Sequence, residues 1–212
     1  MNHQTTVQVW DIFVRLFHWS LVIAFTIAYL TSEEENAWHI YSGYCVLGLI
    51  IFRFLWGFLG SKHARFKDFV HSPAVVMTYV KSLRAGNAPH YLGHNPIGGW
   101  MVMALLSTLL LVTLSGLKVY AIEEGQGPFA HSPSLSPIAT AQAEEEEEEE
   151  EEDEGDESKD EAEEEFWEEI HEASSNFMLV LIALHILGVV ASGYLHKEKL
   201  IKAMITGKKN QP

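Results

Sequence analysis

The chain has a single cysteine, Cys45, among its 212 residues. One cysteine excludes an intramolecular disulfide, and no Cys-x-x-Cys-His motif for covalent haem attachment is present. A zinc-type Cys/His spacing is missing as well. The first residues lack a basic-then-apolar stretch followed by a small-residue cleavage site. We therefore expect the first apolar run, from about Phe13 to Leu30, to be a retained helix rather than a signal peptide.

Basic residues are few, and most acidic residues lie in one block. The net charge is −15 at pH 7, from 14 Lys and Arg against 29 Asp and Glu. Residues 144–169 hold 20 of the acidic residues and one basic residue, Lys159, so this block carries −19 and the remaining chain +4. The mean hydropathy of +0.04 therefore averages one highly acidic block with an apolar, mildly basic remainder.

Four apolar segments approach the roughly 20 residues that a helix needs to cross a bilayer. We expect helices at about 12–30, 39–59, 97–121 and 166–195. The sequence thus predicts an all-α integral membrane protein, in which residues 1–212 form a single domain built as a four-helix bundle.

Lysine and arginine indicate the orientation of these helices. They gather in the connection between the second and third segments and in the C-terminal tail: Lys62, Arg65, Lys67, Lys81, Arg84, Lys197, Lys199, Lys202, Lys208 and Lys209. The other two connections are acidic. We therefore expect both termini to be cytoplasmic and residues 122–165 to form an acidic loop on the outer side of the membrane.

Two of the connections carry local predictions. Residues 128–165 are expected to be disordered, because Pro, Ser and nine consecutive glutamates bury too little apolar surface to offset ordering. Within residues 68–83, a short amphipathic helix is expected from about Pro73, lying on the membrane surface. The side chains expected to enter the membrane are Val75, Val76, Tyr79 and Leu83.

Four of the eleven histidines lie within or at the ends of the apolar segments: His18, His39, His171 and His185. Ionisable groups there are costly and favour a functional role. His171 and His185 are fourteen residues apart, so their rings share one helix face about 21 Å apart along the axis. Depth in the membrane pairs His18 with His185 at the inner side and His39 with His171 at the outer side. Each pair can supply both axial ligands of one haem iron, which favours electron transfer over oxygen binding.

Other residues agree with this interpretation. Gly43 and Gly188, each about one turn from a candidate ligand, leave room for a porphyrin face, although glycine also serves close helix packing. Arg15 and Arg53 are candidates for binding the propionates of the inner haem, with simple anchoring at the inner membrane surface as the alternative. The alternative for the four histidines is interhelical hydrogen bonding or a proton path.

These segments resemble the bacterial four-helix dihaem cytochrome b561 family, which includes the cytochrome b subunits of hydrogenases and formate dehydrogenases. The matching pieces are VRLFHW at 14–19, HIYSGY at 39–44, His171, and LHILG at 184–188. The resemblance covers about residues 1–121 and 166–207 and leaves out the acidic loop. It implies two non-covalent haem b groups at these four histidines, and electron exchange between membrane quinone and a partner protein. It also implies a bacterial inner-membrane location, with residues 122–165 as a periplasmic loop.

The expected function is therefore electron transfer in a respiratory chain, between the quinone pool and a periplasmic redox protein such as a c-type cytochrome. Candidate quinone contacts are His94, Asn95 and Trp100. The acidic loop is either a solvated spacer or an attractor of a basic partner. No nucleic-acid partner is expected.

Two other functions remain open. The first is a superoxide:quinone oxidoreductase acting alone, which the negative potential of the acidic loop disfavours because it repels an anionic substrate. The second is a haem-free membrane protein that handles cations through the acidic loop and the histidines.

Overall fold

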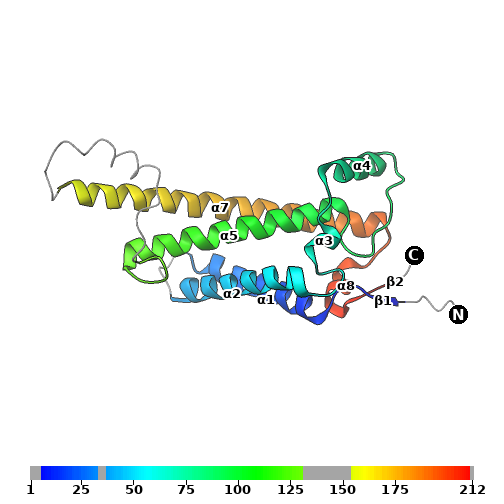
Figure 1. Ribbon diagram of the computed structural model, residues 1–212, viewed down its shortest axis with the longest axis horizontal. Helices are drawn as coiled ribbons and strands as arrows, with labels where there is room; N and C mark the ends of the chain where they lie inside the picture. Colours follow the sequence, from blue (N-terminus) through cyan, green and yellow to red (C-terminus); the bar gives the residue numbers. More distant parts are fainter. Residues whose placement is uncertain (1–5, 33–36, 131–153, 211–212) are drawn as a thin grey trace. The chain divides into compact units, whose positions relative to one another are not determined.

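The computed structural model describes residues 6–32, 37–130 and 154–210. Along the chain lie β1 (Thr6–Gln8), α1 (Ile12–Leu30), α2 (Ala37–Leu59), α3 (Phe66–Phe69), α4 (Pro73–Arg84), α5 (Pro96–Glu124), α7 (Glu154–Leu195), α8 (Leu200–Thr206) and β2 (Lys208–Asn210) (Figure 1). Four of these helices, α1, α2, α5 and α7, are long and apolar enough to cross a membrane. The predicted all-α membrane fold with four spanning helices is confirmed.

The helix boundaries agree with the predicted ones except around the acidic block. The first helix matches at both ends, whereas α5 runs on to Glu124 and α7 begins at Glu154 instead of residue 166. Residues 154–165 are therefore helical where disorder was expected. Glutamate, lysine and alanine are good helix formers, and they extend an apolar helix whose nucleation cost is already met. Residues 122–124 of the predicted acidic loop belong to α5, and residues 131–153 lie outside the described residues.

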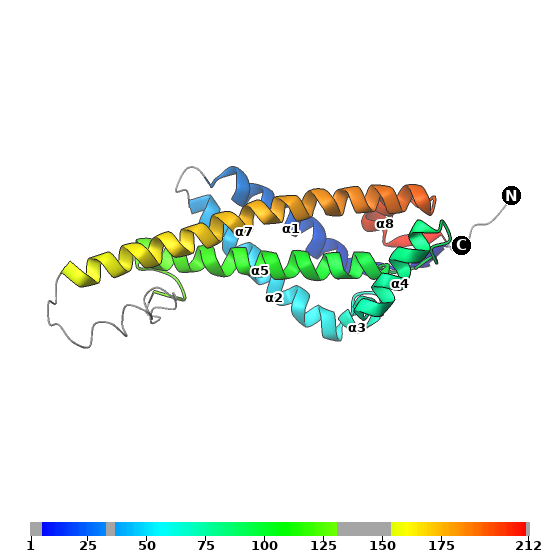
Figure 2. The ribbon, with the colours of Figure 1, turned by 90° about the horizontal axis from the view of Figure 1, so that it is seen from above.

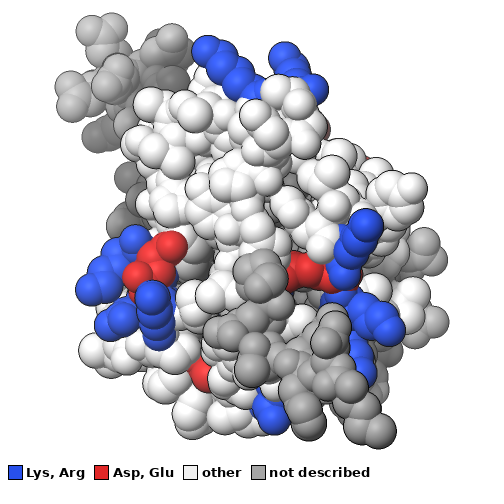
Figure 3. Space-filling model, turned by 90° about the vertical axis from the view of Figure 1, so that its right-hand side faces the viewer, with Lys and Arg blue, Asp and Glu red and all other residues white. Residues whose placement is uncertain are grey.

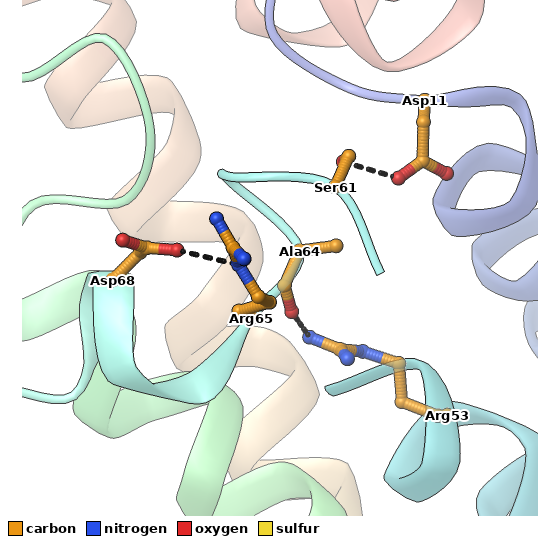
Figure 4. A network of polar contacts seen from close by, with 6 residues as sticks. All are labelled: Asp11, Arg53, Ser61, Ala64, Arg65 and Asp68. Carbon is orange, nitrogen blue, oxygen red and sulfur yellow. Dashed lines mark hydrogen bonds and ion pairs between the residues drawn. The ribbon is translucent and has the colours of Figure 1, made fainter. Parts of the chain in front are cut away.

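The described residues belong to two compact units, residues 1–107 with 179–212, and residues 108–178. In the first unit α1 packs against α2. Asp11 caps the start of α1, where its Oδ1 accepts a hydrogen bond from the Val14 amide at 2.8 Å. Its Oδ2 accepts hydrogen bonds from Trp56 Nε1 at 3.1 Å and from the Ser61 hydroxyl. One carboxylate thus joins the start of α1 to the end of α2 (Figure 4).

The two ends of the described chain are joined in the first unit. Strands β1 and β2 are antiparallel, with Val7 opposite Lys209. The amides of Val9 and Trp10 both donate to the carbonyl of Gly207, at 2.8 and 3.1 Å. Gly207 ends α8 in the left-handed region, with φ of +80°, which glycine adopts without strain. Strands of three residues carry no periodic sequence signal, so this pairing was not predicted.

The long connection between α2 and α5 holds the short helix that the sequence predicts. It begins at Pro73, as expected of proline in the first turn, and Val75 and Leu83 are exposed. The prediction for Tyr79 is wrong: this side chain is only 4% exposed and its ring lies 5.7 Å from that of Tyr91. Tyr79 therefore fixes the helix to its own connection rather than to lipid.

The second unit contains the C-terminal half of α5 and the N-terminal part of α7, which run side by side (Figures 1 and 2). Lys118 on α5 and Glu163 on α7 form an ion pair at 3.1 Å, and both side chains are buried. Trp167 Nε1 donates to the same carboxylate at 3.4 Å. A buried charge is stable only when it is paired, so this contact sets which faces of the two helices meet.

Candidate functional site

His18 and His185 come together in the first unit. His18 lies on α1 and His185 on the C-terminal part of α7, and the two half-buried imidazoles interact electrostatically. His18 Nδ1 is buried and has no hydrogen-bond partner among the described residues. A buried ring nitrogen without a partner is unusual in a purely structural histidine. Two imidazoles close enough to interact are a suitable donor set for iron.

Two glycines leave open space on helices that carry candidate ligands. A Cβ added to Gly43 on α2 or to Gly188 on α7 would meet no atom within 4 Å. Gly188 lies three residues after His185, on nearly the same face of α7. A flat porphyrin beside either helix would therefore not clash with residue 43 or 188, and the imidazoles are the donors that a haem iron needs.

Arg53 on α2 is the most deeply buried candidate for an anion contact. It is only 4% exposed, and its Nη2 donates to the carbonyl of Ala64 at 3.1 Å (Figure 4). The guanidinium carbon lies 5.0 Å from the ring centroid of Phe66 and 5.8 Å from that of Phe69. Its Nη1 is buried and has no partner among the described residues. A buried guanidinium with an unused donor favours an anionic ligand such as a carboxylate.

Arg15 has a different environment. Its Nη1 donates to the carbonyl of Ile205 on α8, and its Nε donates to that of Asp11 at 3.4 Å. These bonds tie the start of α1 to the C-terminal helix. Two of the three guanidinium nitrogens of Arg15 are thus already used by the main chain.

His94, just before α5, lies in an aromatic cage. Its ring centroid is 4.7 Å from that of Trp10 and 4.9 Å from that of Phe69. Burial, together with the positive charges of Arg53 and Lys209, lowers the pKa of His94 to about 3. His94 is therefore neutral at physiological pH. The sequence predicted His94 only as a quinone contact. Its enclosure could not be predicted, because Trp10 and Phe69 lie far from His94 in the chain.

His39 and His171 share a feature that His18 lacks. His39 Nδ1 lies 2.9 Å from the carbonyl of Ala28 in the first unit, and His171 Nδ1 lies 2.9 Å from that of Val112 in the second. A carbonyl acceptor places the ring proton on Nδ1, so each imidazole carries its lone pair on Nε2. Histidines that bind metals usually have this second hydrogen bond.

The sequence analysis missed the α5 residues around His171. Ser115 Oγ lies 3.2 Å from His171 Nδ1, and Gly116 faces the same ring. Lys118 is an ionisable residue inside an apolar segment, and such a residue indicates a specific partner or role. The adjacent small residues at 115 and 116 were a weaker sign of close helix approach.

Comparison with known proteins decides the family. The sequence model of prokaryotic cytochrome b561 matches residues 9–207, nearly the whole chain. The chain belongs to the prokaryotic cytochrome b561 family. No curated protein and no solved structure matches the chain significantly.

Family membership confirms the coarse function expected from the sequence. The cytochrome is a multi-pass membrane protein that binds haem b and takes part in electron transfer. The imidazoles of the first unit and the space at Gly43 and Gly188 are consistent with that cofactor.

Proposed function

We propose that this cytochrome carries electrons between membrane quinone and a periplasmic redox protein through two haem b groups. His18 and His185 ligate the inner haem, and His39 and His171 ligate the outer one. The observation that carries the proposal is the electrostatic interaction of His18 on α1 with His185 on α7 in the first unit, together with the buried Nδ1 of His18 that has no partner among the described residues. Haem bound by two histidines supplies reversible one-electron transfer. The pairing of His39 with His171 rests on the sequence, in which both residues lie at the predicted outer ends of their apolar segments.

Arg53 is the better-supported candidate for holding a propionate of the inner haem. Its buried Nη1 has no partner among the described residues, and Arg53 interacts electrostatically with His94, as does His185. A guanidinium there can neutralise a carboxylate that would otherwise be buried without a counter-charge. Arg15 remains a second candidate, with fewer donors to offer.

The quinone site is proposed near His94, Asn95 and Trp100, at the start of α5. His94 offers a neutral ring with a buried Nδ1 that lacks a partner among the described residues. Asn95 Oδ1 caps α5 by accepting from the Gly98 amide at 2.7 Å, and Trp100 Nε1 donates to the His71 carbonyl at 2.9 Å. His94 therefore has a buried ring nitrogen to spare for a hydrogen bond with a quinone oxygen.

Charge supports an orientation with both termini in the cytoplasm of a bacterium, in its inner membrane. Figure 3 views the end of the first unit that carries α4, α8 and the two strands, and Lys and Arg side chains are spread around it. Basic residues at this end are what the positive-inside tendency favours for a cytoplasmic face. The acidic residues 144–169 then lie on the periplasmic side, where they attract a basic redox partner.

Four single substitutions test the ligand pairs by haem content and by redox titration of the α-band. We expect His18→Ala and His185→Ala each to lose the same haem, and His39→Ala and His171→Ala each to lose the other. His196→Ala, a half-buried histidine outside the spanning helices, is the control and should keep both haems. The proposed pairing is wrong if His18→Ala and His171→Ala remove the same redox transition.

A further inference from the structure

The turn of α5 from Val112 to Gly116 forms a close-fitting seat for the His171 ring in the second unit. We call Val112, Ser115 and Gly116 the His171 seat. The carbonyl of Val112 lies 2.9 Å from His171 Nδ1, and Ser115 Oγ lies 3.2 Å from the same nitrogen. Both oxygens can therefore accept a hydrogen bond from the same ring N–H of His171.

Ser115 is arranged to accept this hydrogen bond. Its side chain is fully buried, and its hydroxyl donates to the carbonyl of Leu111 at 2.9 Å or of Val112 at 3.1 Å. Because the hydroxyl proton is directed back to the helix, an oxygen lone pair is available to the imidazole.

Gly116 is required by the approach of the ring. A Cβ at this position would lie 2.7 Å from His171 Cε1 and 3.0 Å from Nδ1, closer than van der Waals contact allows. The exposed Gly48 on α2 offers a contrast, because a Cβ there meets nothing within 4 Å. The absence of a side chain at residue 116 is thus matched to the position of His171.

The Lys118–Glu163 ion pair fixes the register of the seat against α7. Lys118 lies one turn beyond Ser115 on α5, and Glu163 lies eight residues before His171, about 12 Å along α7. Shifting either helix would separate two buried charges, which is costly. His171 is therefore held facing residues 112–116 by a contact outside the seat.

We propose that Ser115 and Gly116 are positioning residues for His171 as an axial haem ligand, and that they tune the reduction potential of that haem. The inference rests on the proposed ligation by His171. Hydrogen bonding at Nδ1 fixes the tautomer with the lone pair on Nε2 and makes the imidazole a stronger donor, which stabilises ferric iron. Gly116 sets the plane in which the ring can lie.

The first test is redox titration of purified Ser115→Ala, with the haem-to-protein ratio measured on the same sample. The Val112 carbonyl remains, so we expect both haems to be retained and the midpoint potential of one haem to shift upward. Thr113→Val is the matched control, because it also removes a buried hydroxyl that donates to an α5 carbonyl, Leu109 at 2.8 Å. The control should shift neither potential. Loss of only the outer haem from Ser115→Ala, with both kept in Thr113→Val, would support the same role.

The second test is Gly116→Ala, compared with Gly48→Ala. The added methyl must displace the ring, so we expect altered low-spin g-values, or loss, of the outer haem in Gly116→Ala and no change in Gly48→Ala. His171→Ala separates the two levels of the argument. If it keeps both haems, the ligation itself is wrong. If it loses one haem while Ser115→Ala and Gly116→Ala leave both potentials and spectra unchanged, only the positioning role is refuted.

Discussion

Histidines of this cytochrome occupy three chemically different environments. His18 meets a second imidazole and has a buried ring nitrogen without a partner among the described residues. His39 and His171 each have a main-chain acceptor at Nδ1. His94 is enclosed by aromatic rings and is held neutral. The first two environments suit metal ligation, whereas the third suits a hydrogen bond to an uncharged ligand.

The environment of His94 predicts a pH dependence of stability. Its pKa is about 3 in the folded protein, against 6.5 for an ordinary histidine, so the unfolded chain takes up the proton first. The free energy of unfolding therefore falls as pH drops from about 6.5 towards 3, by up to about 1.4 kcal/mol per pH unit. His94→Phe keeps an aromatic ring between Trp10 and Phe69, and it should flatten this decline.

The measurement is the midpoint of thermal unfolding in detergent, followed by circular dichroism between pH 6.5 and 4.5. His196→Phe serves as the control and should keep the slope of the unaltered protein. An equal slope in His94→Phe would show that another group is responsible for the pH dependence.

Only some of the residues of the candidate site could be predicted from the sequence. The candidate ligands His18 and His185 could be found because a histidine in an apolar helix stands out, and the fold brings these two together. Ser115 and Gly116 could not be assigned, because small residues are ordinary in membrane helices. Their role depends on contact with the His171 ring, which belongs to a helix more than fifty residues further along the chain.

At the scale of elements, a buried ion pair within the first unit holds the C-terminal strand β2 to Glu198, just after α7. Lys209 on β2 is buried, and its Nζ lies 2.9 Å from Glu198. His90 Nε2 lies 2.8 Å from the other oxygen of the same carboxylate. Burial alone would raise the pKa of Glu198, but the hydrogen bonds from Lys209 and His90 outweigh it and hold that pKa below its usual value.

Glu198→Ala should destabilise this arrangement strongly, by about 3–5 kcal/mol, because it leaves the Lys209 ammonium buried without a counter-charge. The matched change is Asp68→Ala, which breaks the partly exposed Arg65–Asp68 pair at 3.2 Å and should cost about 1 kcal/mol or less. Chemical or thermal unfolding in detergent compares the two. Equal losses of stability would mean that burial of Lys209 has no energetic consequence.

Elements with long periodic or apolar patterns were predictable, and short ones were not. The boundaries of α1 and the start of α4 at Pro73 follow from apolar length and from proline. The strand pair, α3 and α8 depend on contacts between distant segments, such as the amides of Val9 and Trp10 on Gly207. The start of α7 at Glu154 was not predicted, because the acidic composition of residues 154–165 indicates disorder. The helix propensity of glutamate and alanine in this segment indicates the opposite.

The whole molecule is divided in charge, with −19 on residues 144–169 and +4 on the rest. Long-range attraction between such a block and a basic partner raises association rates and is screened by salt, with a Debye length of about 8 Å at 0.15 M ionic strength. Deleting residues 144–160, which keeps the Glu163 partner of Lys118, should slow electron transfer to a basic c-type cytochrome at low salt and reduce the salt dependence. Stopped-flow oxidation of the reduced protein measures both. An unchanged rate and salt dependence would identify the block as a spacer.

The central proposal is that each chain of this cytochrome binds two haems. Each haem iron then has two axial histidine ligands. Haem quantification combined with redox titration of the purified, full-length cytochrome tests it most directly. We expect two non-covalent haem b groups per chain and two resolved low-spin transitions in the α-band. A preparation that stays at one haem per chain when supplied with excess haem, or that lacks a b-type band after reduction, would contradict the account.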